Sequence, residues 1–244
     1  MLTIHAADLV ATGDGRPARP GGAVLVDGPR LAAVGHHEEL AAGHPTARVR
    51  RWPGLLTPGL LNPYGPELLE RAYHPDPREA DGLGVEPLTG EALAALAMTD
   101  ARWGASARRG VQRMLAHGTV AVAGELGRRP AVLDAVRRAG ITTGPRLAPP
   151  TGPPSLDPLA SAESLTAVFV GPLPSVGGPG DAGEGPSASA GLWRPVEAAL
   201  RPLPSAGVAT FAVFDVPDEA ALLERGAATC VATVVAGRLV HRRR

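Results

Sequence analysis

Lysine is absent from the 244-residue sequence, so all 24 basic residues are arginines. A chain without a lysine amine cannot form a Schiff base, use a lysine general base or carry a carbamylated-lysine metal bridge. The 24 acidic residues balance the arginines, and the formal net charge is zero. A neutral chain gives no reason to expect nucleic acid or an anionic membrane as a partner.

Cysteine is nearly absent too, because Cys230 is the only one. A single thiol excludes an internal disulfide and a cysteine-based zinc cluster. No apolar run approaches the roughly 20 residues that cross a bilayer. Residues 1–8 show no basic segment leading into an apolar core, so no signal peptide is predicted. We therefore expect a cytoplasmic protein with no membrane partner.

Glycine and proline are abundant, with 31 and 26 copies. They concentrate, together with serine, at residues 145–158 and 171–191. Segments of this composition bury too little apolar surface to offset the entropy of ordering, so we expect loops there.

The two ends of the chain are rich in β-strand patterns. A hairpin is predicted where two apolar runs, 23–27 and 30–34, meet at the Gly28-Pro29 turn. Further strands and two short helices follow from alternation and turn residues. The other expected strands are 2–5, 8–12, 47–52, 209–214, 230–235 and 239–241, and the helices are 36–42 and 218–224.

The middle of the chain alternates between helix and strand patterns. Residues 89–117 have near-helical apolar spacing, interrupted at Trp103-Gly104, and 129–139 form a second helix that ends at Gly140. Strands are expected at 119–123, 141–143 and 165–170. This alternation is typical of βα units around a parallel sheet.

Several of these stretches, taken in order, resemble the amidohydrolase superfamily, closest to its imidazolonepropionase and aminodeoxyfutalosine deaminase branch. Residues 21–35 are similar to the family's opening strands. Residues 54–62 look like its "PGLVNAHTH" segment, and 106–122 look like the helix and strand that follow. The closing residues, 211–215 and 231–240, resemble the family's last strands.

The resemblance implies an α/β fold in which both chain ends build one small β-sandwich, the composite domain. We assign residues 1–61 and 208–244 to that sandwich and 62–207 to a truncated TIM-barrel-like α/β segment. A complete eight-stranded barrel typically needs about 250 residues, so it does not fit in the middle segment. Its exposed edges would need cover from loops or a partner.

The sequence departs from the family at the metal ligands. The family's His-x-His pair, whose side chains reach one ion from the same side of a strand, is replaced here by Tyr64 and Pro66. The resemblance also implies later histidine ligands, yet no histidine lies between His117 and His241. Asp215 matches a sandwich position rather than the barrel aspartate. We therefore predict no metal site and assign no catalytic residue.

Three residues remain as candidates for binding a ligand. They are Tyr64 at the lost ligand position, His74 shortly after it, and Glu125 at the carboxyl end of a barrel-type strand. His74 is spaced i, i+2 from Asp76, which could suggest a metal site, but polar, proline-punctuated sequence of this kind is usually an exposed loop. His117, at a helix end, is explained by interaction with the helix dipole.

A second group of residues could also supply ligands. For this second group, a role on the solvated surface is the simpler explanation. The carboxylates near His74 are Glu67, Glu70 and Glu79, and the histidine cluster in the sandwich is His36, His37 and His44 with Glu38 and Glu39.

The leading hypothesis is an amidohydrolase-like pseudoenzyme that has lost metal-dependent catalysis and binds a small molecule or a partner. The partner would be a second copy or a full-length amidohydrolase. The alternative is a hydrolase of non-peptide carbon–nitrogen bonds, a deaminase or cyclic amidase, with zinc or another divalent metal held by unrecognised residues. A decaying gene product without activity is the third hypothesis.

Overall fold

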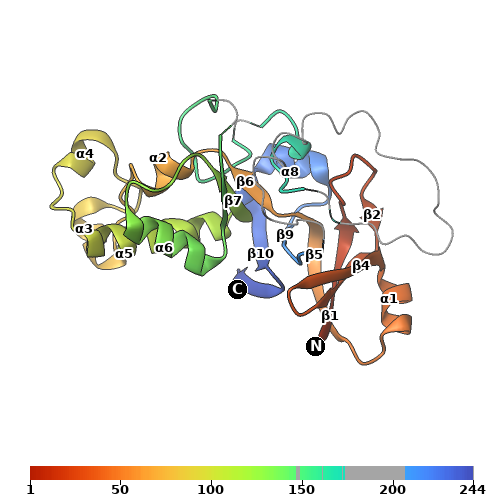
Figure 1. Cartoon of the computed structure of the whole chain (residues 1–244). Helices are drawn as coiled ribbons and strands as arrows, with labels where there is room; N and C mark the ends of the chain where they lie inside the picture. Colours follow the sequence, from red (N-terminus) through yellow and green to blue (C-terminus); the bar gives the residue numbers. More distant parts are fainter. Residues whose placement is uncertain (147–148, 161, 172, 174–206, 244) are drawn as a thin grey trace.

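The computed structural model describes residues 1–146, 149–160, 162–171, 173 and 207–243. It combines an eight-stranded sheet with a three-stranded sheet and several helices, so the α/β prediction is confirmed. Figure 1 shows the large sheet at one end of the molecule and most helices at the other. Among the described residues, no helix has the length and apolar character needed to cross a membrane.

Both chain ends contribute to the eight-stranded sheet. Its order is β11-β10-β9-β5-β1-β3-β4, with β2 paired to β1. The central strand β5 runs parallel to β1 and antiparallel to β9, so it joins the N-terminal and C-terminal strands. The strands are β1 (Leu2–Val10), β2 (Arg19–Pro20), β3 (Gly22–Asp27), β4 (Arg30–His36), β5 (Arg48–Pro58), β9 (Phe211–Phe214), β10 (Cys230–Val235) and β11 (Arg238–Arg242).

This sheet curls so that its β3–β4 hairpin touches the residues that lead into β9. Leu31 N donates to Gly207 O at 2.7 Å, and Ala209 N donates to Pro29 O at 2.9 Å. Val24 of β3 and Phe211 of β9 belong to one buried cluster that the curl encloses. The expected sandwich is therefore a continuous sheet wrapped around a shared core, and helix α1 (His37–Gly43) covers part of its other face.

The Gly28-Pro29 hairpin forms as predicted. Asp27 pairs with Arg30 across a two-residue turn, and Gly28 takes a φ of 54°, which glycine adopts without a steric penalty.

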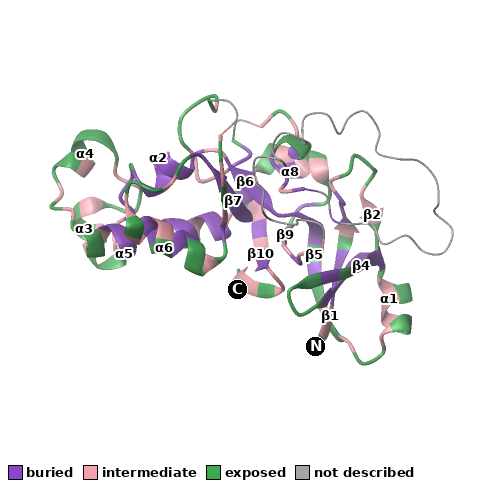
Figure 2. Ribbon diagram, viewed as in Figure 1, coloured by how far each residue is buried: buried purple, intermediate pink, exposed green. Residues whose placement is uncertain are grey.

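The second sheet contains three short parallel strands in chain order. They are β6 (Leu60–Asn62), β7 (Thr119–Ala123) and β8 (Thr142–Gly144). Helix α5 (Asp100–Leu115) leads into β7, and α6 (Pro130–Ala139) connects β7 to β8. Their apolar faces form one buried cluster with α2 (Gly65–Leu69), which Figure 2 shows in purple.

Short elements complete the described chain. They are the 3₁₀ helices Pro77–Glu79, Leu165–Ala167 and Ala227–Thr229 and the α-helices α3 (Ala80–Leu83), α4 (Gly90–Ala94) and α8 (Glu219–Arg225). The loop expected at 171–191 lies almost entirely outside the described residues. The described part of 145–158 contains neither helix nor strand. The predicted boundaries between sandwich and barrel-like segment stay predictions.

Several sequence predictions are wrong. The strands expected at 2–5 and 8–12 are one strand, β1, and the helical stretch 89–117 breaks at 95–99, between α4 and α5. Trp103-Gly104 does not interrupt a helix, because both residues lie buried inside α5. A Cβ on Gly104 would approach the Ala131 Cβ to 3.3 Å, so this glycine permits close packing of α5 on α6. The expected strand 165–170 is instead a 3₁₀ turn, and Phe169 alone makes a β-bridge, to Leu60.

Candidate functional site

The carboxyl ends of β6, β7 and β8 lie along one edge of the parallel sheet. We call this edge, with Asn62, Tyr64, Glu67, Glu125 and Arg146, the strand-end rim. Folds built from parallel strands gather their functional groups at this edge. Asn62 is the last residue of β6, while Glu125 and Arg146 follow β7 and β8 by two residues each.

A loop of the chain itself covers part of the rim. Asn62 is fully buried, and its side-chain amide donates to Ser155 O at 2.9 Å. Its carbonyl oxygen accepts from Tyr64 N at 2.9 Å. The Tyr64 hydroxyl donates to Thr151 O at 2.6 Å and lies 3.1 Å from Gly152 O. These contacts fasten residues 151–156, the rim loop, onto the strand end.

An ion pair holds the neighbouring part of the rim. Arg146 donates to both Glu67 oxygens, at 3.2 and 2.5 Å, and to Pro63 O at 2.7 and 3.0 Å. Burial alone would raise the pKa of Glu67, but hydrogen bonding and charge from Arg146 outweigh it and hold the pKa below its ordinary value. Glu67 is therefore a paired carboxylate rather than a free ligand.

The residues of the rim do not fit a divalent metal. The Tyr64 oxygen already contacts two carbonyls, and Pro66 has no ligand atom. Packing is tight here as well, because a Cβ on Gly65 would lie 2.9 Å from Ala123 O. Throughout the described ranges, no group of three or more His, Cys, Asp or Glu side chains could hold a metal ion.

The three predicted binding residues occupy different surroundings, and no hydrogen bond of the described structure joins any two of them. Tyr64 lies under the rim loop and is 4% exposed. His74 is 1% exposed and packs against Gly110 of α5, whereas Glu125 is exposed. Their role in binding a ligand stays a prediction.

The His74 side chain is buried and fixed by a hydrogen bond to the backbone. Its Nε2 donates to Leu68 O at 2.8 Å, and its backbone N donates to Ser106 Oγ at 2.9 Å. Burial, with the nearby charges of Arg113 and Arg109, lowers the pKa of His74. Its Nδ1 is buried without a partner among the described residues.

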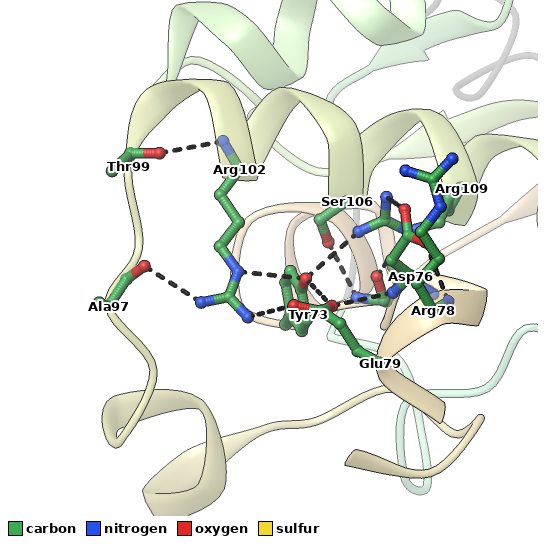
Figure 3. Close-up of polar contacts among 10 residues, drawn as sticks. Tyr73, Asp76, Arg78, Glu79, Ala97, Thr99, Arg102, Ser106 and Arg109 are labelled. Carbon is green, nitrogen blue, oxygen red and sulfur yellow. Dashed lines mark hydrogen bonds and ion pairs between the residues drawn. The ribbon is translucent and has the colours of Figure 1, made fainter. Parts of the chain in front are cut away.

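Two acidic residues near His74, Asp76 and Glu79, belong to a structural network around Tyr73, shown in Figure 3. The Tyr73 hydroxyl donates to Glu79, and Arg102 donates to Glu79 Oε1 at 2.7 Å and to the Tyr73 oxygen at 3.1 Å. Arg109 pairs with Asp76 at 3.2 Å. The pKa of Glu79 is lowered, and the hydrogen bond from Tyr73 is the largest cause. These carboxylates are paired within the protein.

Glu70, the remaining carboxylate of this group, fixes the loop that leads into helix α6. Its Oε1 accepts from Gly127 N at 3.0 Å and from Arg129 N at 3.2 Å. The side chain is 4% exposed, and Oε2 has no partner within the described chain.

The histidine cluster of the sandwich borders a separate open depression of about 650 Å³. Among the residues that line it are Asp8, the stretch 36–39, Arg51 and Trp52. The Asp8 carboxylate accepts a hydrogen bond from Gly54 N at 2.7 Å, so its role is to stabilise the backbone of β5.

No protein-family model and no curated protein matches this chain. Among solved structures, it is similar to A. niger ochratoxinase at 20% identity and a TM-score of 0.41, over 59% of this chain and 31% of that one. It is also similar to molinate hydrolase, at 18% identity and a TM-score of 0.42, over 59% of this chain and 29% of that one. A third similar structure is Helicobacter pylori aminofutalosine deaminase, at 12% identity and a TM-score of 0.38, over 59% of this chain and 33% of that one.

These structures are an ochratoxinase, a hydrolase and a deaminase, which agrees with the resemblance inferred from the sequence. The chain spans about a third of the length of the structures it matches. At these identities the likeness concerns the fold alone and specifies neither activity nor substrate.

Proposed function

We propose that this chain is an amidohydrolase-like protein that has lost metal-dependent catalysis and acts by binding a ligand or a partner chain. The observation that carries the proposal is the rim loop seated on the carboxyl end of β6 by Asn62 and Tyr64. The Asn62 amide and the Tyr64 hydroxyl at this edge are committed to the chain's own backbone.

Energetics support a rim that stays closed. Lifting the rim loop would leave the buried Asn62 amide and the Tyr64 hydroxyl without their carbonyl partners. Each such hydrogen bond contributes about 0.5–1.5 kcal/mol net, since the released groups bond to water instead. The Arg146–Glu67 pair adds charge-assisted hydrogen bonds on the adjacent side. A metal-bound hydroxide, by contrast, requires an open coordination position beside the substrate.

A partner chain is supported by the edge of the three-stranded sheet. Within the described ranges, β8 pairs with β7 on one side and with no strand on the other. Thr143, in the middle of β8, is exposed. An unpaired strand edge is a template for another chain, and the proposed partner is a second copy or a longer amidohydrolase.

Two measurements on the purified protein test this proposal. Ammonia release and ring opening are assayed on cyclic amides and amino-heterocycles, with and without added zinc or manganese. We expect no turnover above a heat-denatured control. Metal-dependent turnover would contradict the proposal and establish the hydrolase alternative.

Light scattering on the same sample tests the partner. We expect the molar mass of a dimer that falls to that of a monomer in Thr143→Lys, because a charge on an edge strand blocks pairing. A monomer whose mass does not change when a full-length amidohydrolase is added would contradict a role in partner binding.

A further inference from the structure

A group of arginines lies at one end of the curled sheet, on elements separate from the strand-end rim. Arg48 and Arg50 alternate along β5, which places them on the same face as Trp52. Arg242, near the end of β11, lies over the Trp52 ring, with its guanidinium carbon 5.7 Å from the ring centroid. We call Arg48, Arg50 and Arg242 the arginine cluster.

The three cations are close enough to influence one another. Burial first, and then the charges of Arg48 and Arg242, lower the pKa of Arg50. His5 pairs with Arg50 in the sheet register, and its pKa falls to about 4 through burial and the charge of Arg50. The imidazole beside the cluster is therefore neutral near pH 7 and adds no compensating charge.

No carboxylate within the described ranges forms an ion pair with the cluster. Arg102 and Arg146, which are half-buried as Arg50 is, pair with Glu79 and Glu67, whereas Arg48 and Arg242 are exposed. The chain as a whole is neutral. The excess of positive charge is therefore local to this end of the sheet.

Arg50 also carries an unused donor. Its Nε is buried and has no hydrogen-bond partner in the part of the chain that the structure describes. A buried N–H of a charged group is costly to leave unpaired, so its presence calls for an acceptor. Guanidinium groups are planar donors whose geometry matches the oxygens of phosphate and carboxylate.

We propose that Arg48, Arg50 and Arg242 form a binding site for a small oxyanion, namely a phosphate dianion or the phosphate of a phosphomonoester. Three guanidiniums supply the charge, and their terminal N–H groups supply donors for the oxygens of the anion. Two negative charges on one group neutralise the cluster better than a monovalent anion. This site goes beyond the proposed function and does not depend on it.

The test is a calorimetric titration of the full chain with inorganic phosphate, with sodium chloride adjusted to keep ionic strength constant. We expect saturable binding at one site per chain. Arg50→Gln and Arg242→Gln should each weaken binding at least tenfold. The matched control is Arg51→Gln, because Arg51 pairs with Ala6 on the opposite face of the sheet. Its affinity should stay within twofold of the parent.

Thermal unfolding separates binding from a structural role. Without phosphate, Arg50→Gln should melt at or above the temperature of the parent protein, because it relieves repulsion between like charges. With phosphate, the melting temperature of the parent should rise while that of Arg50→Gln stays constant. Arg242→Gln, a change at an exposed residue of β11, gives the same comparison if Arg50→Gln fails to fold.

Three outcomes would overturn the proposal. The first is the absence of saturable phosphate binding, and the second is equal weakening by Arg51→Gln. The third is tighter binding of a short oligonucleotide with a steep salt dependence, which would indicate a nucleic-acid surface instead. Glycerol phosphate distinguishes the two sources of the anion, since a phosphomonoester site binds it at least as tightly as inorganic phosphate.

Discussion

Arg146 Nη2 lies 2.5 Å from Glu67 Oε2, and this ion pair links the residues after β8 to helix α2 across the strand-end rim. Both side chains are largely buried, with exposed fractions of 23% and 19%. The same arginine donates twice to Pro63 O, so one side chain ties together the loop after β6, helix α2 and the end of β8.

Arg146→Gln should lower the free energy of unfolding by about 2 kcal/mol, because it leaves the Glu67 carboxylate and Pro63 O without their charged donor. Urea unfolding measures the change. The matched control is Arg71→Gln, which removes the other arginine beside Glu67. Arg71 is 57% exposed and 3.7 Å from the carboxylate, so its loss should cost less than about 0.5 kcal/mol. Equal effects would contradict a specific role for Arg146.

Tyr64→Phe should release the rim loop. The change removes the hydroxyl that donates to Thr151 O, at an expected cost of about 1–2 kcal/mol. Hydrogen exchange should accelerate in residues 151–156. Tyr73→Phe is the control, because its hydroxyl belongs to the network of Figure 3 and does not touch this loop. Faster exchange of the rim loop in Tyr73→Phe alone would contradict the assignment.

Gly54→Ala should destabilise the sheet by more than about 3 kcal/mol. Gly54 has a φ of 72°, and a Cβ there would lie 2.3 Å from Phe214 O. The variant therefore combines backbone strain with a clash against fixed main chain. Gly15→Ala is the matched control, since Gly15 also has a positive φ but no atom within 4 Å of the Cβ position. Its cost should stay near 1 kcal/mol, and equal costs in calorimetry would contradict the clash.

Stability should fall as the pH drops through the range in which His5 titrates. Burial and Arg50 lower the pKa of His5 from 6.5 to about 4, so the unfolded chain takes up the proton first. Stability is therefore unaffected by His5 above about pH 7 and declines between 6.5 and 4, by at most about 3 kcal/mol in total.

The Trp52 indole donates to His5 Nδ1 at 3.1 Å, so His5→Asn keeps an acceptor while removing the titration. This variant should flatten the decline measured by urea unfolding at successive pH values. An unchanged slope would show that His5 does not bind the proton on unfolding.

Local patterns predict the regular elements of this protein well. Alternation around Gly28-Pro29 predicts the hairpin, and the apolar runs at 119–123 and 230–235 coincide with β7 and β10. Gly140, with a φ of 76°, ends α6 as expected. These features depend on neighbouring residues, which is why the sequence alone specifies them.

Contacts between distant residues escape such patterns. The interruption expected at Trp103-Gly104 fails because tertiary packing against α6 favours a glycine inside the helix. Asn62 meets Ser155 across 93 residues, and Arg146 meets Glu67 across 79. Their positions at the ends of parallel strands were the available signal, but no local rule identifies their partners.

The arginine cluster illustrates the same limit. The alternation of Arg48 and Arg50 is visible in the sequence and indicates a shared face of a strand. The approach of Arg242 depends on the order of the sheet, in which the last strand curls back toward Trp52.

The central claim is that the strand-end rim holds no catalytic metal, and elemental analysis of the purified, dialysed protein tests it most directly. We predict less than about one tenth of an equivalent of zinc, iron or manganese per folded chain, because Tyr64 and Glu67 are committed to internal partners. A near-stoichiometric metal that survives dialysis and is lost in Tyr64→Phe would contradict the account and establish a metal-dependent hydrolase.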